Sequence, residues 1–328
     1  MSKILVTGGA GFIGSSTSEE LLKQGYDVVC LDNFCDYYDV NLKRKNVELV
    51  KAVAKETNKS YELVEGDIRD KDLVNNLFKK HHFDAVIHLA AMAGVRPSIE
   101  RPDYYFDVNI NGLLNILEGM RNNGCNKLVF ASSSSVYGNN KKVPFSEKDN
   151  VDNPISPYAA TKKAGELMCY TYHQLFNIDV NCVRYFTVYG PRQRPDLAIN
   201  KFTRLMLEGK QIPMFGDGTT ARDYTFISDI VHGTLLALNN VLNSTNEYDI
   251  FNLGGSHPIS LKDLIDLIGN TLNIKPEIDK LPMQSGDVNI TYSDYSHAKE
   301  KLGYEPKVRI EEGIKEFVTW YKKENNYE

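Results

Sequence analysis

The stretch that decides the fold runs Thr7-Gly8-Gly9-Ala10-Gly11-Phe12-Ile13-Gly14 and lies directly after the apolar run Lys3–Val6. Its glycines fall at positions 8, 11 and 14, and a helical pattern follows. Glycine allows a tight turn between strand and helix, and it lets a pyrophosphate approach the positive N-terminus of that helix. The stretch therefore predicts a dinucleotide-binding loop. Its cofactor-binding residues would be Gly8, Gly11, Phe12, Ile13 and Gly14.

A tight glycine turn that binds nothing is the alternative, and Asp32 argues against it. Asp32 closes the next apolar run at the distance of about 20 residues expected for the acid that binds the adenosine ribose. Its carboxylate can accept hydrogen bonds from the ribose hydroxyls and would repel a 2′-phosphate. The sequence therefore favours NAD over NADP, with the adjacent Asn33 sharing this role.

Short apolar runs and helical patterns alternate through the first half of the chain. The runs are near-continuously apolar, as expected for strands that are covered on both faces. They comprise Lys3–Val6, Asp27–Leu31, Tyr61–Val64, Ala85–Leu89 and Lys127–Phe130. Such alternation implies βαβ units with right-handed crossovers. It predicts an α/β fold with a Rossmann-type, doubly wound parallel sheet.

The second half of the chain has a more mixed pattern. The expected strands are Val180–Val183, Ile212–Phe215 and Ile250–Leu253, and the expected helices lie near 198–209, 228–240, 260–272 and 310–324. A chain of 328 residues exceeds the usual size of a single hydrophobic core. We therefore expect a Rossmann domain over 1–180, to which later segments return, and a smaller mixed α/β lobe over 181–328 that mainly binds substrate.

Composition argues against several classes of protein and site. The net charge is −5, from 38 Lys and Arg against 43 Asp and Glu, and no long basic run occurs, so nucleic acid is not an expected partner. The five cysteines include no CxxC pair and the seven histidines form no HExxH motif, so we expect neither disulfides nor a metal site. The run from Ala85 to Val95 is too short to span a bilayer. We expect no membrane segment and a cytoplasmic location.

The pattern Tyr-x-x-x-Lys occurs three times, and its context separates the copies. Tyr137–Lys141 runs through Gly138-Asn139-Asn140, whose turn chemistry would not place both residues on one helical face. Tyr295–Lys299 lies in a polar segment, where a surface pair is expected. Tyr158–Lys162 follows Ser156-Pro157, a good helix start, so its two residues would lie one turn apart on one face.

Lys162 would lower the pKa of the Tyr158 phenol, which would then serve as a base near neutral pH. A buried tyrosine with a lysine that extends to solvent is the alternative. The serine run within Ala131–Gly138 follows an apolar strand, so it would face the ligand crevice of an open α/β sheet. There Ser133 would donate to a substrate oxygen while Tyr158 removes its proton and hydride leaves for NAD.

These features together resemble the extended short-chain dehydrogenases/reductases that act on nucleotide sugars, over essentially the whole chain. The resemblance rests on the glycine loop, Asp32, the serine run and Tyr158–Lys162. It implies that Ser133, Tyr158 and Lys162 are catalytic, with Ser133 also binding substrate. It further implies an NAD pocket lined by Asp67, Ile68, Leu89, Ala90, Ala91, Asn109, Tyr158, Lys162 and Tyr185.

The residues before Val136-Tyr137-Gly138 help to choose among three reactions of this family. The dehydratases carry an Asp-Glu pair there, and the decarboxylases of UDP-glucuronate carry a Glu. This chain has Ser134-Ser135, which supply no carboxyl group for either reaction. The remaining reaction is epimerisation, in which a hydroxyl is oxidised and the ketone is reduced again from its other face. NAD is regenerated in each turnover and should stay bound.

Further stretches are similar to UDP-glucuronate 4-epimerases. They are 184–196, Asp32-Asn33-Phe34 with Tyr37-Tyr38, 93–96 and 285–287. This resemblance implies conversion of UDP-glucuronate to UDP-galacturonate through a transient 4-keto intermediate. A 4-epimerase of UDP-glucose/UDP-galactose or of UDP-N-acetylhexosamines is the alternative among enzymes. Outside enzymes, the alternative is a catalytically silent NAD-binding sensor.

The resemblance also implies how a UDP-sugar would be held. Arg222 corresponds to a clamp on the pyrophosphate, and Asp287 would lie near the uridine ribose. Thr187 and Arg194, with Arg192 as a third candidate, follow the strand that ends beside Tyr185. A guanidinium there can hold both oxygens of a sugar carboxylate in one plane. Arg96 is the next candidate. Surface solvation or bonds to loop carbonyls are the alternatives for these arginines.

A homodimer is the expected assembly. In the resembled family, the helix that carries the residue equivalent to Tyr158 pairs with the helix near 103–122 across a two-fold axis. The apolar residues that support this in the sequence could equally belong to the core. They are Leu113, Leu114, Leu117, Leu167 and Met168.

Overall fold

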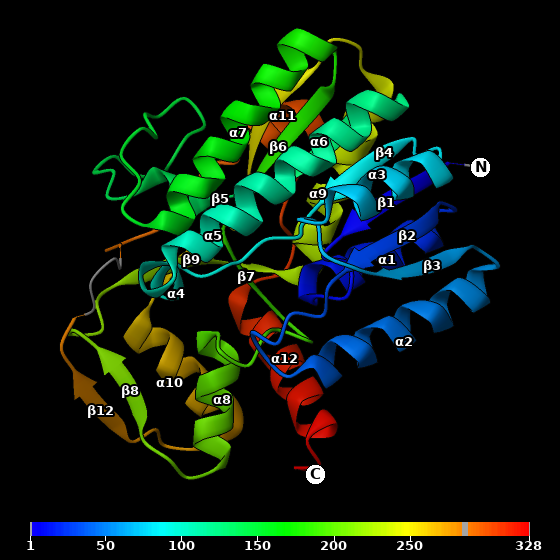
Figure 1. Ribbon diagram of the computed structural model, residues 1–328. Helices are drawn as coiled ribbons and strands as arrows, with labels where there is room; N and C mark the ends of the chain where they lie inside the picture. The colour runs from blue at the N-terminus through cyan, green and yellow to red at the C-terminus, as the bar shows by residue number, and fades with distance from the viewer. Residues whose placement is uncertain (1, 284–287, 328) are drawn as a thin grey trace.

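A computed structural model describes residues 2–283 and 288–327 (Figure 1). At its centre lies a seven-stranded sheet with the strand order β10-β6-β5-β4-β1-β2-β3, in which every pair of neighbours is parallel. Its strands are β1 (Lys3–Thr7), β2 (Asp27–Asp32), β3 (Tyr61–Glu65), β4 (Ala85–His88), β5 (Lys127–Ser133), β6 (Asp179–Tyr185) and β10 (Tyr248–Leu253). The predicted doubly wound parallel sheet is confirmed.

Helices cover both faces of this sheet (Figure 1). One face carries α1 (Phe12–Lys23), α2 (Val40–Thr57) and α9 (Ile227–Asn243), and the other carries α3 (Lys71–Lys80), α6 (Gly112–Asn123) and α7 (Pro157–Phe176). Because successive strand residues point to opposite faces, Ile4 and Val6 join one buried apolar cluster and Leu5 joins the other. Burial on both faces explains why the strands are apolar without interruption.

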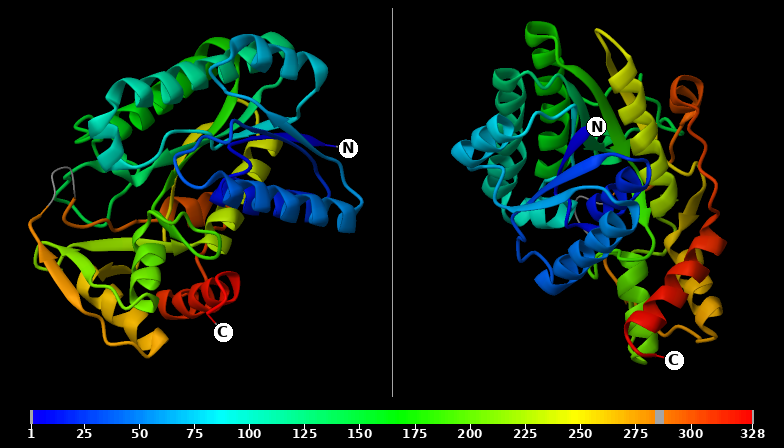
Figure 2. Two further views of the ribbon diagram at one scale, coloured as in Figure 1. Left: turned by 60° about the horizontal axis from the view of Figure 1, so that its bottom comes forward. Right: turned by 90° about the vertical axis from the view of Figure 1, so that its right-hand side faces the viewer.

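The smaller part of the molecule lies beyond the carboxyl ends of the large sheet (Figure 2). Two small sheets have the orders β11-β9-β7 and β12-β8. Their strands are β7 (Thr187–Tyr189), β8 (Ile212–Phe215), β9 (Ala221–Phe226), β11 (Pro258–Ser260) and β12 (Ile278–Leu281). The helices of this part are α8 (Ala198–Leu207), α10 (Leu261–Leu272) and α12 (Ile310–Glu324), and α11 (Ser296–Leu302) packs beside β10.

The chain crosses between these two parts more than once. β6 spans the expected boundary at residue 180, and β10, which lies beyond that boundary, completes the large sheet. The division into a cofactor unit and a substrate unit stays a prediction.

Short helical segments connect β4 to α6. They are α4 (Val95–Glu100), α5 (Pro102–Phe106) and a π-helical turn over Asp107–Asn111, and a 3₁₀ turn over Ser134–Tyr137 follows β5. None of the helices in the described residues is both long and apolar enough to cross a membrane.

Candidate active site

A cavity of about 490 Å³ lies where β1 and its two neighbours end. The chain runs outward from β1 to β2 and β3 on one side, and from β4 onward on the other. This reversal of strand order opens the crevice in which doubly wound sheets bind ligands. The wall is completed by Arg194, Arg222 and Thr291, which come from the second half of the chain.

The glycine loop forms one end of this cavity. Gly8 has a φ of +68°, and a Cβ atom there would lie 2.9 Å from the Ala90 nitrogen. A Cβ atom on Gly14 would lie 2.2 Å from the Gly8 carbonyl oxygen, so α1 can approach the loop only without a side chain at this position. The cavity is lined by all the predicted loop residues, which are Gly8, Gly11, Phe12, Ile13 and Gly14. The loop and the N-terminus of α1 thus suit a pyrophosphate.

Asp32 lies at the same end and is 7% exposed. Its two carboxylate oxygens accept hydrogen bonds from the backbone nitrogens of Ala10 (3.1 Å) and Phe34 (2.9 Å). Each oxygen keeps a further lone pair for the hydroxyls of a ribose. These residues fit the adenosine end of a dinucleotide.

A second carboxylate, Asp67, lies beside Asn33 on the cavity wall. Burial alone would raise the pKa of Asp67, but hydrogen bonds from Arg69 and Asn33 lower this pKa to about 2. Asp67 is therefore anionic at neutral pH. The other predicted NAD-pocket residues that line the cavity are Ile68, Leu89, Ala90, Ala91 and Tyr185.

Asn109 lies behind the cavity wall rather than on it, which corrects the predicted lining. It is 5% exposed, and its side chain accepts from the Met92 nitrogen (2.8 Å) and donates to the Met92 oxygen (3.0 Å). Its amide also donates to the Thr161 hydroxyl (2.9 Å) on α7. Asn109 thereby ties the loop after β4 to the helix that carries Tyr158.

The three predicted catalytic residues line the cavity. Ser133 is the last residue of β5. Tyr158 lies in the first turn of α7, which the Ser156 hydroxyl caps by accepting from the Ala159 nitrogen at 3.1 Å. Lys162 is one turn further on and 5% exposed, and its ammonium donates to the Ala131 oxygen at 2.7 Å.

Burial dominates the protonation of this site. It raises the pKa of Tyr158, which a hydrogen bond with Ser133 and the charge of Arg194 lower only in part. It lowers the pKa of Lys162 to about 8. The expectation that Lys162 lowers the phenol pKa therefore does not hold for the protein alone, because the ammonium bonds to Ala131 and Arg194 is the nearby cation that favours the phenolate.

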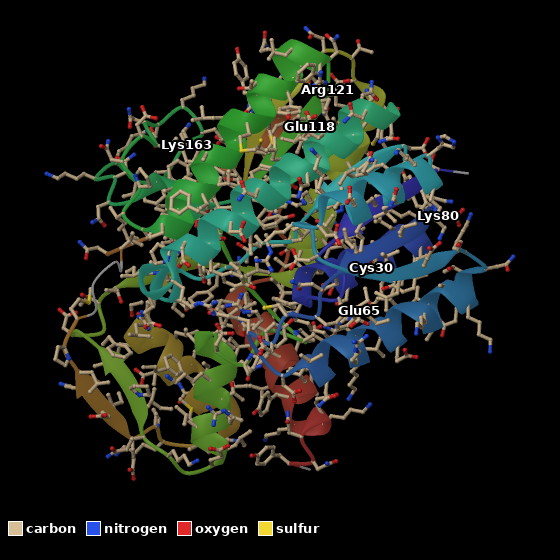
Figure 3. The ribbon with its side chains drawn as sticks, viewed as in Figure 1. Cys30, Glu65, Lys80, Glu118, Arg121 and Lys163 are labelled. Carbon is tan, nitrogen blue, oxygen red and sulfur yellow. The ribbon has the colours of Figure 1, made fainter. Side chains whose placement is uncertain are left out.

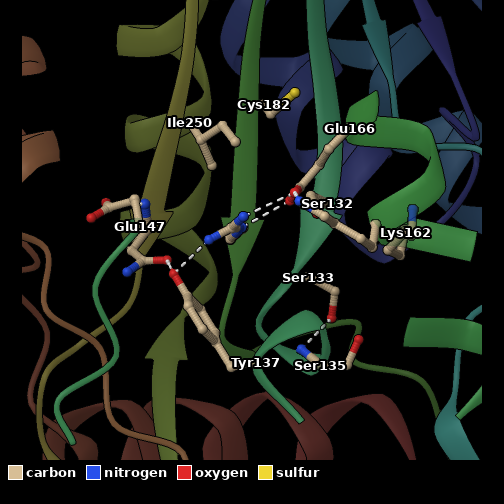
Figure 4. A network of polar contacts seen from close by, with 12 residues as sticks. Ser132, Ser133, Ser135, Tyr137, Glu147, Lys162, Glu166, Cys182 and Ile250 are labelled. Carbon is tan, nitrogen blue, oxygen red and sulfur yellow. Dashed lines mark hydrogen bonds and ion pairs between the residues drawn. The ribbon is translucent and has the colours of Figure 1, made fainter. Parts of the chain in front are cut away.

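A buried ion pair lies behind the serine run (Figure 4). Glu166 and Arg184 are each 1% exposed and form two hydrogen bonds of 2.8 and 2.9 Å. Glu166 also accepts from the Ser132 hydroxyl at 2.6 Å. This pair joins α7, which carries Tyr158, to β5 and β6.

Tyr137 belongs to this network and is not a second base. Its hydroxyl accepts from Arg184 (2.9 Å) and donates to the Asn252 side chain (2.7 Å). The third Tyr-x-x-x-Lys copy lies away from the cavity, with Lys299 paired to Glu305 on the surface. Of the three copies, only Tyr158–Lys162 has both residues on the cavity wall among the described residues, whereas the expected surface pair of Tyr295 with Lys299 is replaced by a pair of Lys299 with Glu305. The sequence analysis did not predict this network, although Arg184, a charged residue directly after the expected strand Val180–Val183, was a signal for it.

Two predicted carboxylate-binding residues, Thr187 and Arg194, line the cavity. Arg194 donates to Asp196 at 2.9 and 2.7 Å, and its guanidinium lies 5.0 Å from the centre of the Tyr37 ring. Arg192 does not line the cavity. Its guanidinium pairs instead with Glu19 on α1 at 2.7 and 3.0 Å.

A second cavity, of about 220 Å³, continues from the first at Arg222, which lines both. Arg96 lines this second cavity rather than the first, with its guanidinium 5.0 Å from the centre of the Phe215 ring. Asp287 lies outside the described residues, as do Ser285 and Gly286. Among the described residues, no group of three or more His, Cys, Asp or Glu side chains is arranged to hold a metal ion.

Comparisons with known proteins identify relatives that match nearly the whole chain. A UDP-glucuronate 4-epimerase of Thermodesulfobacterium geofontis is 46% identical over 323 residues, which cover 98% of this chain and 97% of that protein. The solved structure of UDP-glucuronic acid 4-epimerase from Bacillus cereus, in complex with UDP-glucuronic acid and NAD, is 35% identical with a TM-score of 0.90, and the match covers 98% of this chain and 99% of that one.

A UDP-glucose 4-epimerase from Thermotoga maritima, solved with UDP-glucose, is also 35% identical, with a TM-score of 0.88 and the same coverage of 98% and 99%. The family described as GDP-mannose 4,6 dehydratase matches residues 5–317. These findings confirm the resemblance to the extended short-chain dehydrogenases/reductases of nucleotide sugars, and this chain belongs to the GDP-mannose 4,6 dehydratase family.

Proposed function

We propose that this chain is an NAD-dependent 4-epimerase that converts UDP-glucuronate to UDP-galacturonate through a 4-keto intermediate. The observation that carries the proposal is a single cavity lined by Asp32 beside the glycine loop, by Tyr158 in hydrogen-bond contact with Ser133, and by Arg194, whose charge acts on Tyr158. This set of groups suits a cofactor site, a site of oxidation and an anion site. The 46% identity to a UDP-glucuronate 4-epimerase adds support.

The residues have separate roles in this reaction. NAD, when bound, supplies the acceptor for the hydride of the sugar C4 carbon and returns it to the opposite face. Ser133 donates a hydrogen bond to the C4 oxygen. Tyr158 takes the proton of the C4 hydroxyl and gives it back after the ring has turned. Lys162, held by the Ala131 oxygen, would hold the ribose of the cofactor, and Arg194 supplies the positive charge near the phenol.

The same cavity argues against dehydration and decarboxylation as the main reaction. Ser134 and Ser135 line it where an acid would be required. Among the described residues, the acids that line it are Asp32 and Asp67, both at the cofactor end. Glu166 is near the serine run, but it is 1% exposed and paired with Arg184, so it cannot reach a substrate.

A uronate substrate requires a carboxylate clamp, for which we assign Thr187 and Arg194. UDP-glucuronate oxidised at C4 is a β-keto acid, which loses carbon dioxide unless its carboxylate is held. Arg194 uses two of its five N–H donors on Asp196, which leaves donors for a ligand in the cavity. Burial beside Tyr37 strengthens such a bond, because the local dielectric is low.

The second cavity suits the UDP group. Arg222 lies where the two cavities meet, as a pyrophosphate clamp between sugar and nucleoside should. Phe215, Tyr224 and Leu261 offer apolar and aromatic surface to a uracil ring. Arg96 at the rim adds positive charge toward the phosphates rather than toward the sugar carboxylate.

A 4-epimerase of UDP-glucose is the second candidate. The Thermotoga maritima UDP-glucose 4-epimerase is as similar in sequence, at 35%, as the Bacillus cereus uronate enzyme. Incubation of the purified protein with UDP-glucuronate, UDP-glucose and UDP-N-acetylglucosamine, followed by separation of the products, decides between them. We expect UDP-galacturonate as the dominant product. Preference for UDP-glucose would establish the second candidate instead.

The Arg194→His variant tests the clamp. We expect it to raise the ratio of UDP-pentose to UDP-galacturonate while bound NAD stays at the wild-type amount, because the carboxylate is no longer held in plane. Normal epimerisation by Arg194→His without a decarboxylated product would place the clamp elsewhere.

We also propose a homodimer that forms through α6 and α7. Leu114 and Leu167 are 40% and 55% exposed on these helices, whereas Leu113 and Leu117 are buried in the core and Met168 is half-buried. The two helices pack together within the subunit, where Tyr172 donates to Glu118 at 2.6 Å, and Figure 3 shows Glu118 on this helical layer. A dimeric mass in light scattering is expected, and a monomer would remove this proposal.

We further propose a cytoplasmic location. All five cysteines are free thiols, as expected in a reducing compartment.

A further inference from the structure

We propose that Glu19 and Arg192 form a strut that positions Arg194 and thereby limits the loss of carbon dioxide from the 4-keto intermediate. The proposal rests on the uronate activity and on the carboxylate clamp assigned above. It gives a function to Arg192, which does not reach the cavity, and to Glu19, to which the reaction assigns no role.

The strut is a two-point ion pair between α1 and the loop after β7. The Arg192 guanidinium donates to both carboxylate oxygens of Glu19, at 2.7 and 3.0 Å, and to the Ser16 hydroxyl at 3.1 Å. The two charged side chains are only 18% and 16% exposed. Paired donors and acceptors fix direction as well as distance, and partial burial reduces screening by salt.

The loop needs such an anchor because its backbone is strained at this point. Arg192 has a φ of +69°, a left-handed conformation that residues other than glycine adopt rarely. The next residue, Gln193, is 2% exposed, and its amide donates to the Val188 oxygen at 3.1 Å. Arg192 and Arg194 therefore stand on either side of one fixed residue. The guanidinium of Arg192 binds Glu19 on α1, and that of Arg194 lines the cavity.

The anchor connects the clamp to the cofactor side of the cavity. Ser16 and Glu19 lie one and two turns after Phe12, and the Ser16 hydroxyl donates to the Phe12 oxygen at 3.2 Å. Phe12 belongs to the loop end that lines the cofactor site. Through this chain of contacts, the guanidinium of Arg194 keeps a fixed position relative to the cofactor while the sugar ring turns.

The side reaction that the clamp suppresses is the loss of carbon dioxide from the 4-keto intermediate. The bond between C5 and the carboxylate carbon breaks, and carbon dioxide leaves. The electron pair of the broken bond forms the enolate of the C4 ketone, and a proton from water adds at C5. The ketone is then reduced by the hydride removed at the start, and its oxygen takes back the proton held by Tyr158. A UDP-pentose results. Decarboxylation requires the bond from C5 to the carboxylate carbon to stand perpendicular to the plane of the C4 ketone, so that its electrons enter the carbonyl π system. A displaced Arg194 no longer holds the carboxylate away from this orientation and therefore increases the side reaction.

The test compares product ratios of the NAD-loaded enzymes. Glu19→Gln and Arg192→Met should each raise the ratio of UDP-pentose to UDP-galacturonate about threefold or more, because a small displacement of a binding group has large kinetic effects. The charge-exchanged double variant Glu19→Arg/Arg192→Glu should bring the ratio back toward wild type. Bound NAD should stay at the wild-type amount in all of them.

Glu20→Gln is the matched control, since Glu20 lies on the same helix in an exposed pair with Lys23 and should leave the ratio unchanged. If Arg194→His raises the ratio but Glu19→Gln and Arg192→Met do not, the strut is refuted while the clamp stands. If Arg194→His leaves the ratio unchanged, the clamp assignment itself fails. Equal loss of both products in the strut variants would show a merely structural role and also overturn the inference.

Discussion

Two parts of one cavity are built in different ways. Ser133, Tyr158 and Lys162, which we call the catalytic floor, stand on a central strand and a long helix. Residues 187–197, which we call the substrate wall, run mostly as a loop. The pair of Arg192 with Glu19 attaches this loop to α1, and the pair of Arg194 with Asp196 lies within it. The floor is backed by the buried pair of Glu166 and Arg184, whereas the pairs of the wall are partly exposed.

The catalytic floor supplies the groups for the reaction, and the substrate wall supplies the groups that select the substrate. Oxidation at a sugar carbon needs the same three groups whatever the sugar, and regular elements hold such groups most accurately. The choice between a uronate and a neutral sugar needs one anion site, and a loop can change there without disturbing the sheet. We therefore expect changes in the floor to abolish turnover or stability, and changes in the wall to redirect products.

The largest effect should come from Tyr158→Phe. The variant keeps the packing of α7 but removes the hydroxyl that we propose as the acceptor of the C4 proton, so turnover should fall by about 10²–10⁴-fold. Binding of UDP-glucuronate, measured by calorimetry, should persist. Tyr295→Phe is the control, since Tyr295 lies outside the cavity. A comparable loss in Tyr295→Phe would remove the distinction between the copies of the motif.

The next effect should be on stability, from Glu166→Gln. This change leaves the Arg184 guanidinium buried without its counter-charge, and breaking a buried pair in this way costs about 3–5 kcal/mol. Urea unfolding monitored by circular dichroism measures the loss. Glu208→Gln, in an exposed pair with Arg204, should show a far smaller change. Equal stabilities of the two variants would mean that the floor is no better anchored than the surface.

The catalytic floor could be predicted because its signal is local. Tyr158 and Lys162 lie four residues apart behind a helix start, and the glycine loop and Asp32 follow strands that are apolar on both faces. These are short-range rules of backbone geometry. The large sheet follows from the same alternation, and every strand and helix expected by residue range occurs with shifts of a few residues.

The rest depends on contacts that sequence spacing does not reveal. Arg192 and Arg194 are two residues apart and chemically alike, yet the left-handed backbone at Arg192 sends their side chains to different partners. Asn109 was expected to line the cofactor site, but its side-chain amide donates hydrogen bonds to Met92 and Thr161 instead. The strands β7 and β11 have only three residues each, too few for a periodic pattern.

Asp32→Ala should have a smaller effect, confined to the choice of cofactor. Loss of the carboxylate removes hydrogen bonds to the ribose and the repulsion of a 2′-phosphate, so the preference for NAD over NADP should narrow by about 10- to 100-fold. Binding titrations of both nucleotides measure this ratio. Asp67→Asn is the comparison. Because Asp67 is already hydrogen-bonded to Arg69, its loss should change the ratio of NAD to NADP affinity less. Wild-type protein that binds both nucleotides equally would contradict the role of Asp32.

The smallest effect should appear in the pH dependence of stability, and it belongs to Lys162. Burial lowers the pKa of this lysine from 10.5 to about 8. Below pH 8 the lysine is protonated in both states, and its burial destabilises the fold by a constant amount. Between pH 8 and 10.5 the unfolded chain binds more protons at this site than the folded one, so the free energy of unfolding rises with pH.

Lys162→Met removes this dependence, and it thereby isolates the lysine from the other titrating groups. The free energy of unfolding of wild type minus that of Lys162→Met should increase by about 1 kcal/mol per pH unit between pH 8 and 9.5 in urea titrations. A constant difference would mean that Lys162 keeps an ordinary pKa. The ammonium would then reach solvent, and the catalytic floor would be as open as the substrate wall.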